Sequence, residues 1–339
     1  MKVVFLGTPE PAVPSLRALL ASEHEVAAVV TRPDKPRDRA GGRAAPSPVK
    51  LVAEAAGVPV LQPARGRDPD FPAALAATGA EIGVTCAFGL LLPEPVLSAL
   101  PGGFLNVHFS LLPAYRGAAP VQRALQDGVT VTGVTIFQLD EGMDTGPVLS
   151  RAEVPVEPGE NAGALTARLA EVGAALLVET LGGIAAGALQ PSPQPEQGAS
   201  HAAKVTTADA RLDFTTSAAA VVNAVRAFTP APGAWTTLRG RRLKVLAASA
   251  PPALRPDAAP APPGVTAVSA PPASDLGHAP AAGALAPGQI ALAADGGLLV
   301  GAADGPVRLE RVQPDGKRPM DGADLARGLR PGPGERVGE

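Results

Sequence analysis

The sequence predicts an α/β protein with a doubly wound, mostly parallel sheet, followed by a small β-barrel domain. Residues 2–31 give the order strand, turn, helix, strand, which is how a parallel, doubly wound sheet begins. A Pro-, Ser- and Gln-rich stretch at 189–204 reads as a linker, and several short strand patterns with Gly turns follow it. A chain of 339 residues is also long for one hydrophobic core. We therefore expect a Rossmann-like domain over 1–188 and a second domain over 205–339.

The first domain is expected to alternate short strands with helices. Strand patterns cover residues 2–7, 26–31, 58–61 and 81–87, and helix patterns cover about 11–21, 46–56 and a segment that begins near 70. The turn Gly7-Thr8-Pro9-Glu10-Pro11 lacks the GxGxxG spacing of dinucleotide sites. Its two prolines also remove amide donors that a pyrophosphate would use. The sequence therefore argues against NAD binding.

The stretch from Gly103 to Gly146 carries the chemistry. An apolar strand pattern contains Asn106 and His108, a helix pattern follows at about 117–127, and a second strand ends at a Gly-flanked acidic loop with Asp144. Side chains two apart on a strand share a face, so the amide and the imidazole point to one side while Val107 points into the protein.

Together these groups suit one reaction. An amide NH2 stabilises an oxyanion, a neutral imidazole takes a proton from an attacking amine, and Asp144 on its sharply turning loop orients the imidazole. The stretch contains no obvious protein nucleophile, so it indicates direct acyl transfer between two bound substrates. Whether His108 or another group removes the amine proton stays open at this level.

Beyond the acidic loop the patterns continue to the end of the chain. An edge strand at 147–154 and a long Leu/Ala helix at 161–186 complete the first domain. The second domain is expected to contain a helix at 217–228, a hairpin at 235–246 that turns at Arg239-Gly240, and strands at 289–293, 298–300 and 307–312. The Ala/Pro-rich insertion at 250–287 is expected to be disordered or an extended loop.

The residues Asn106 to Pro113, with Tyr115 to Pro120 and Asp140 to Gly146, resemble the signature of the folate-dependent formyltransferases, and most of all the methionyl-tRNA formyltransferases. The similarity extends from Met1 to near Asp324. It implies that Asn106, His108 and Asp144 are catalytic, that 10-formyltetrahydrofolate donates the formyl group, and that the α-amine of methionyl initiator tRNA accepts it. It also implies that the second domain is an OB-like barrel that binds tRNA. The folate contacts that it implies are Ser110, Leu111, Leu112, Pro113, Phe88, Gly89, Leu90 and Asp140.

Two basic segments are candidates for the tRNA contact. The net charge is only −3, so any RNA contact must come from local patches. Residues 32–43 contain five basic and two acidic residues, and the resemblance implies that this loop reaches the acceptor end of tRNA. The loop departs from the family's usual basic pattern in length and spacing, and Arg39 and Arg43 are the candidates for the contact. In the second domain, residues 226–244 contain basic but no acidic residues. Arg239, Arg241 and Arg242 are the candidates there, and phosphate contacts would make binding salt-dependent.

Two other functions are compatible with parts of this pattern. The same chemistry with glycinamide ribonucleotide, an amino-sugar nucleotide or water as acceptor would not need the basic segments. A non-enzymatic RNA-binding protein would not need Asn106, His108 and Asp144 together.

Composition places further bounds on the protein. The single Cys86 excludes an internal disulfide and reads as a small packed hydrophobe, and the four scattered histidines suggest no metal site. No apolar run approaches the ~20 residues of a membrane span. We expect a cytoplasmic monomer.

Overall fold

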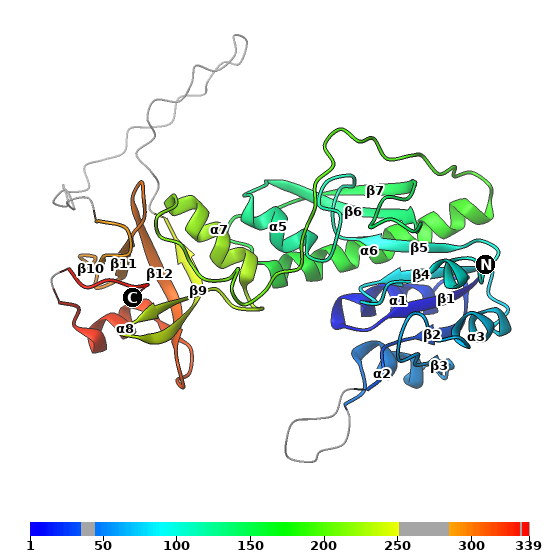
Figure 1. Ribbon diagram of the computed structural model, residues 1–339, viewed down its shortest axis with the longest axis horizontal. Helices are drawn as coiled ribbons and strands as arrows, with labels where there is room; N and C mark the ends of the chain where they lie inside the picture. Colours follow the sequence, from blue (N-terminus) through cyan, green and yellow to red (C-terminus); the bar gives the residue numbers. More distant parts are fainter. Residues whose placement is uncertain (35–44, 251–284, 333, 339) are drawn as a thin grey trace, which may run out of the picture. The chain divides into compact units, whose positions relative to one another are not determined.

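The computed structural model describes residues 1–34, 45–250, 285–332 and 334–338. The chain forms two compact units, one with residues 1–124 and 129–205 and the other with residues 125–128 and 206–339 (Figure 1). The candidate tRNA contacts Arg39 and Arg43 lie outside the described residues, as do positions 251–284 of the Ala/Pro-rich insertion. No helix among the described residues is long and apolar enough to cross a membrane.

The first unit is built on a seven-stranded sheet in the order β3-β2-β1-β4-β5-β6-β7. Neighbours from β3 to β5 pair in parallel, and β6 and β7 are added antiparallel. The order reverses between β1 and β4, and ligands of such sheets bind beyond the carboxyl ends of the strands near that point. The predicted doubly wound, mostly parallel sheet is therefore confirmed. The strands are β1 (Lys2–Gly7), β2 (Glu25–Val30), β3 (Val60–Leu61), β4 (Ile82–Cys86), β5 (Phe104–His108), β6 (Val131–Gln138) and β7 (Val148–Pro155).

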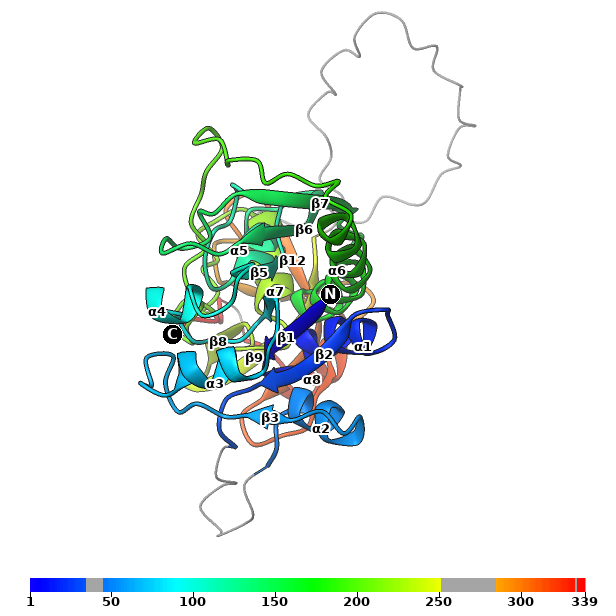
Figure 2. The same ribbon diagram turned by 90° about the vertical axis from the view of Figure 1, so that its right-hand side faces the viewer.

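Helices cover both faces of this sheet. In Figure 2, α1, α2 and α6 lie on one side of it, and α3 and α4 lie on the other. The long helix α6 begins where the Asn161 side chain accepts a hydrogen bond from the backbone N–H of Ala164, which satisfies one free donor of the first turn. The short helix α4 was not predicted, because four residues are too few to show a period. The helical elements are η1 (Glu10–Ala12), α1 (Val13–Leu20), α2 (Pro48–Ala55), α3 (Phe71–Ala77), α4 (Glu94–Leu97), α5 (Pro120–Gln126) and α6 (Ala162–Ala185).

The core lies between the sheet and these helices. Val3 to Leu6 of the first strand are fully buried. Cys86 is also fully buried, and burial raises the pKa of its thiol to about 12. The prediction that this residue packs as a small hydrophobe is confirmed, because a thiol with so high a pKa carries almost no thiolate at neutral pH.

The second unit is a curled antiparallel sheet that closes part of a barrel. Its strand order is β10-β11-β12-β9-β8, with β13 paired to β12. The hairpin turns at Arg239 and Gly240 as predicted, and both have positive φ, 52° and 70°, as a two-residue hairpin turn of type I′ requires. The elements β13 and α8 were not predicted. The bounds are α7 (Ala218–Phe228), β8 (Trp235–Leu238), β9 (Arg241–Ser249), β10 (Ile290–Leu292), β11 (Leu298–Gly301), β12 (Pro306–Pro314), β13 (Met320–Asp321) and α8 (Gly322–Leu329).

Candidate active site

A cavity of about 570 Å³ opens at the carboxyl ends of β4 and β5. The three residues predicted as catalytic, Asn106, His108 and Asp144, all line it. Asn106 and His108 come from β5, and Asp144 comes from the loop after β6. Val107 between them also lines the cavity, but it is only 3% exposed and its Cγ1 lies against Gly173 of α6. The alternation of a strand therefore places the amide and the imidazole on the cavity side, as predicted.

The His108 ring is held between two oxygen atoms. Its side chain is 6% exposed; Nε2 lies 3.0 Å from the carbonyl oxygen of Tyr115, and Nδ1 lies 3.6 Å from Oδ2 of Asp144. A carbonyl can only accept, so Nε2 carries the hydrogen of this bond and the lone pair of Nδ1 faces the carboxylate. Burial lowers the pKa of His108 below its ordinary value, although the charge of Asp144 and the Tyr115 carbonyl act in the opposite direction. The neutral imidazole is therefore the form present at neutral pH, with Nδ1 as its basic atom.

A backbone hydrogen bond to its carboxylate and a left-handed backbone conformation fix the position of Asp144. Its Oδ2 accepts a hydrogen bond of 2.7 Å from the backbone N–H of Gly117, and its own φ is 56°, in the left-handed region. Tyr115, whose carbonyl holds His108, also has a left-handed φ of 60°. Non-glycine residues seldom adopt this conformation unless their surroundings impose it. The loops after β5 and β6 are therefore shaped so that a carbonyl and a carboxylate face the same imidazole.

Asn106 has a partner that the sequence did not reveal. Thr85 on the neighbouring β4 is paired in register with it, and Thr85 Oγ1 lies 2.7 Å from Asn106 Oδ1. The hydroxyl also lies 3.0 Å from the Leu105 carbonyl oxygen, and the contact with Asn106 Oδ1 is the shorter of the two. Donation to Oδ1 directs the NH2 end of the amide away from Thr85. Thr85 is 4% exposed and also lines the cavity. The only signal in the sequence was a hydroxyl residue within an otherwise apolar strand.

The residues that the resemblance assigned to folate fall into two groups. Phe88, Gly89, Leu90 and Asp140 line the cavity, and Ser110 to Pro113 are not among its lining residues. This second group forms a turn instead, in which Ser110 and Leu112 are buried. Ser110 Oγ donates to the Ala114 carbonyl at 2.6 Å, and the Leu112 N–H donates to Thr135 Oγ1 at 3.1 Å. The turn fixes the chain just before Tyr115.

Asp140 shapes the acidic loop. Its Oδ1 accepts hydrogen bonds from the Gly142 N–H at 3.0 Å and from Thr145 Oγ1 at 2.8 Å. A Cβ on Gly142 would collide with the Thr145 hydroxyl, and a Cβ on Gly146 would collide with the carbonyl oxygen of Gln138. The two glycines therefore permit the close turns by which this loop reaches the cavity.

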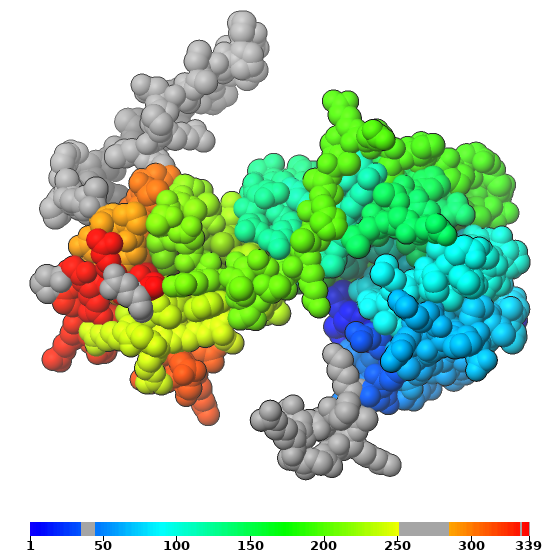
Figure 3. Space-filling model, in the orientation of Figure 1, coloured from blue at the N-terminus to red at the C-terminus, as the bar shows by residue number. Residues whose placement is uncertain are grey.

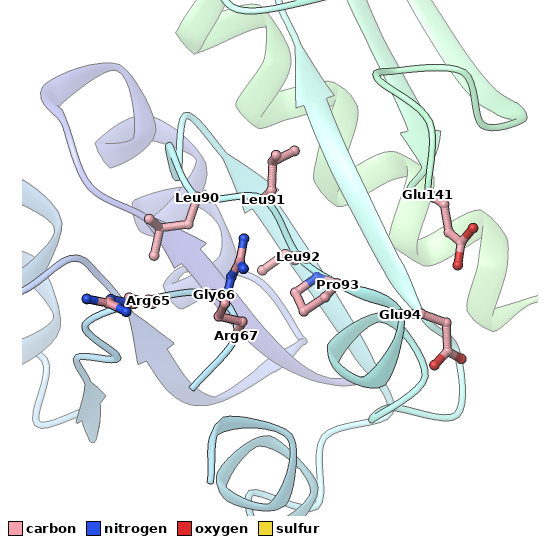
Figure 4. Close-up of a pocket in the computed structure, with 9 residues that line it drawn as sticks. All are labelled: Arg65, Gly66, Arg67, Leu90, Leu91, Leu92, Pro93, Glu94 and Glu141. Atoms are coloured by element: carbon pink, nitrogen blue, oxygen red, sulfur yellow. The ribbon is translucent and has the colours of Figure 1, made fainter. Parts of the chain in front are cut away.

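A second cavity of about 840 Å³ adjoins the first, since Leu90 to Leu92 and Glu141 line both. Arg65 and Arg67 bring two positive charges to it, from a loop that the sequence reasoning did not single out. Figure 4 shows Arg65 at one side and Glu94 and Glu141 at the other, with the leucine stretch between them. The combined hollow therefore has a stretch of leucines along it, with the candidate trio Asn106, His108 and Asp144 at one part and the two arginines, together with Glu94 and Glu141, at another.

The arginines predicted to contact tRNA in the second unit have different surroundings. Arg239 Nε lies 2.7 Å from Glu335 Oε1, which raises the pKa of the arginine and offsets its charge. The side chain of Arg241 is 71% exposed, with Asp315 at 3.9 Å. Arg242 stacks on Trp235, with its guanidinium carbon 4.3 Å from the ring centroid. The acidic partners come from distant parts of the chain, so the local charge count of 226–244 overstated the free positive charge.

Comparisons with known proteins agree with this architecture. Residues 1–181 match the family model described as formyl transferase, and residues 204–330 match that of the formyl transferase C-terminal domain. The chain is 47% identical over 339 residues to the methionyl-tRNA formyltransferase of Thermobifida fusca, with 100% of both chains covered. It is 48% identical over 340 residues to the methionyl-tRNA formyltransferase of Streptomyces coelicolor, again with 100% of each covered.

A solved structure shares the fold. The N-formyltransferase from Helicobacter canadensis, in complex with folinic acid and dTDP-3-aminofucose, superposes with a TM-score of 0.64 at 15% identity. The match covers 91% of this chain and 98% of that one. At this identity the likeness supports the fold alone.

Proposed function

Since this chain belongs to the formyl transferase family, we propose that it transfers the formyl group of 10-formyltetrahydrofolate to the α-amine of methionyl initiator tRNA. The observation that carries this proposal is the identity of 47–48% over the full length to proteins named methionyl-tRNA formyltransferase. The product, formylmethionyl-tRNA, is used to initiate translation. The arrangement of Asn106, His108 and Asp144 supports the chemistry independently of those names.

The reaction needs a stabilised oxyanion and a place for one proton. The amine nitrogen attacks the formyl carbon, and the carbonyl oxygen becomes negative as the new N–C bond forms. The Asn106 NH2, oriented by Thr85, donates to that oxygen. The bond between the formyl carbon and N10 of the folate then breaks, and N10 leaves with a proton.

We assign the removal of the amine proton to His108. Nδ1 is its basic atom, because Nε2 donates to the Tyr115 carbonyl. Nδ1 and Asp144 Oδ2 are both acceptors and stand 3.6 Å apart, so an amine N–H placed between them finds a partner at either atom. When Nδ1 takes the proton, the charge of Asp144 stabilises the imidazolium. The proton is then available for the departing N10.

The two adjoining cavities suit a folate. The apolar loop at Phe88 to Leu92 offers a surface for flat rings, and the acidic loop with Asp140 faces it across the first cavity. Arg65 and Arg67 on the second cavity provide positive charge for the carboxylates of the folate glutamate. In this arrangement Ser110 to Pro113 do not contact the folate directly. They form the backbone turn that positions Tyr115, whose carbonyl oxygen holds His108.

The remaining assignments extend the same proposal. Arg39 and Arg43, with Arg241 and Arg242 in the second unit, would bind tRNA phosphates, and Arg239 would contribute less because Glu335 pairs with it. Domain limits of 1–188 and 205–339, joined by 189–204, follow from the sequence. A cytoplasmic monomer fits these substrates, since one chain carries the whole catalytic trio.

A parallel transfer assay tests the proposal. Radiolabelled 10-formyltetrahydrofolate is offered with methionyl initiator tRNA, methionyl elongator tRNA or glycinamide ribonucleotide, and label on each acceptor is counted. We expect label on the initiator tRNA alone, and a loss of about 100-fold or more in turnover for Asn106→Ala and for His108→Ala. Label on the small acceptor, or release of free formate only, would overturn the assigned acceptor.

A further inference from the structure

The segment 189–204 does more than join the two units. Figure 3 shows it running as a ridge across the surface of the first unit. Its Ser192 exchanges two backbone hydrogen bonds with Val148, at 2.7 and 2.8 Å. Further along, the Ser200 carbonyl accepts from the N–H of Arg116 at 2.9 Å, and the Ala202 N–H donates to the Arg116 carbonyl at 2.6 Å. The segment therefore binds the start of β7 and the loop after β5, which is one of the two loops that form the candidate active site.

Gln194 lies at the centre of these contacts. It is the only residue of 191–200 that is not exposed. Its Nε2 donates to the carbonyl oxygens of Asp144, at 2.9 Å, and Gly146, at 2.7 Å. Its Oε1 accepts from Nε of Arg116 at 3.0 Å and from Nη2 of the same guanidinium at 2.7 Å. Both donors and both acceptor positions of the amide are thus in use.

This pattern admits only one orientation of the amide. If the group were reversed, its NH2 would face a guanidinium that can only donate, and its oxygen would face two carbonyls that can only accept. An amide fixed in this way is a rigid strut between the two loops. Glutamate in its place would keep the acceptor for Arg116 but would set an oxygen against the carbonyls of Asp144 and Gly146.

The strut bears on the catalytic contact itself. Gln194 holds the carbonyl of Asp144, whose backbone has the left-handed φ of 56°, and it holds the side chain of Arg116 next to Gly117. The Gly117 N–H donates to the Asp144 carboxylate at 2.7 Å. A Cβ on Gly117 would stand 2.8 Å from the Ala202 oxygen, so the same segment passes too close to this residue to leave room for a side chain. Gly117 and Asp144, the two partners of the hydrogen bond that orients the carboxylate toward His108, are therefore both positioned by contacts with residues 189–204.

We propose that Gln194 is a positioning residue that sets the placement of Asp144 against His108, which makes the segment 189–204 a working part of the active site. This inference rests on the proposed formyl transfer. Without the strut, Asp144 relaxes out of its left-handed conformation and its carboxylate moves away from the imidazole. The His108 base then loses the charge that supports its protonated form, while the apolar folate surface at Phe88 to Leu92, which Gln194 does not contact, stays in place.

The test compares Gln194→Ala, Gln194→Glu and, as a matched control, Gln197→Ala, an exposed glutamine of the same segment. We expect kcat to fall about 10–100-fold in both Gln194 variants, with KM for each substrate within about threefold, because small misplacements of a catalytic group are costly. Gln197→Ala should match the wild type. The acid limb of the pH–kcat profile should move to lower pH in Gln194→Ala, since His108 loses the influence of Asp144.

The outcomes separate this inference from the proposed function. If the wild-type protein forms no formylmethionyl-tRNA, the proposed function fails, and the same variants are then compared on whichever acceptor the protein does formylate. If the wild type is active and Gln194→Ala keeps its kcat and pH profile, the inference is overturned. A change confined to KM would also overturn it, because that result makes Gln194 a binding contact. A lower kcat with an unmoved acid limb would assign it a merely structural role.

Discussion

Helix α6 approaches strand β5, which carries Asn106 and His108, so closely that one added methyl group should disturb the strand. Gly173 of α6 is buried, and a Cβ there would stand 2.9 Å from Cγ1 of Val107 and 3.2 Å from Cγ1 of Val134. Gly182, in the same helix, has no atom within 4 Å of the corresponding point. Gly173→Ala and Gly182→Ala therefore make the same chemical change, one against the strand that carries Asn106 and His108 and one in open space.

The expected free energies follow from two opposing effects. Replacing a helical glycine with alanine stabilises by roughly 0.5–1 kcal/mol, because the unfolded chain loses conformational freedom. Overpacking a filled core costs about 1–3 kcal/mol. Gly182→Ala should therefore raise the free energy of unfolding by about 1 kcal/mol. Gly173→Ala should lie about 1–3 kcal/mol below it.

The assay is urea unfolding followed by circular dichroism at 222 nm. Tryptophan fluorescence would not serve, because the single Trp235 belongs to the second unit. Activity gives a second measurement: Val107 lies between Asn106 and His108, so Gly173→Ala should lower kcat by about 3–10-fold, and Gly182→Ala should leave it unchanged. Equal stabilisation by both substitutions, with unchanged kcat, would show that the close approach of helix and strand does not constrain the site.

Three further predictions concern the site and the basic surface. Because burial lowers the pKa of His108, the neutral base is present at neutral pH, and kcat should fall only as the pH drops through that lowered pKa. The charge of Asp144 raises the pKa of His108, and Asp144→Asn removes this effect. The pH–rate profile of Asp144→Asn should therefore show its acid limb at still lower pH. Thr85→Val should lower kcat several-fold and cost about 1 kcal/mol in thermal unfolding, whereas Thr85→Ser, which keeps the hydroxyl, should change both much less. Arg241→Ala should weaken tRNA binding and reduce the slope of log affinity against log salt by about 1. Arg239→Ala should reduce affinity and slope less, because Glu335 already pairs with Arg239. Equal slopes for the two variants in filter-binding titrations would contradict this.

The sequence predicted those parts of the fold and site that depend on local order. Strand alternation correctly set Asn106 and His108 on the cavity side and Val107 in the core, because a side chain's face is fixed by its position in the strand. Most strand and helix patterns of both units were recognised for the same reason, although helix α8 of the second unit was missed. The short elements α4 and β13 contain too few residues for a period to appear.

Contacts between distant parts of the chain stayed hidden. Thr85 is 21 positions from Asn106 and meets it only through the register of β4 and β5. Glu335 is 96 positions from Arg239, so no count of charges in 226–244 could reveal that pair. Gln194 belongs to a stretch whose composition indicates a linker, and nothing in composition distinguishes a linker from a segment that binds backbone carbonyls.

In the proposed mechanism, the geometry around His108 favours an attacking group that carries a hydrogen. Around His108, the Tyr115 carbonyl and the Asp144 carboxylate are both acceptors, and a neutral imidazole has one N–H to offer them. Tyr115 takes that hydrogen at 3.0 Å, which leaves Nδ1 and Oδ2 facing one another with two lone pairs. An amine placed there satisfies this contact before it reacts, and its proton needs to move only to the nearer acceptor as the new bond forms. The same contact that costs free energy in the isolated protein therefore favours binding of the amine beside Nδ1, the atom to which we assign its deprotonation in the proposed mechanism.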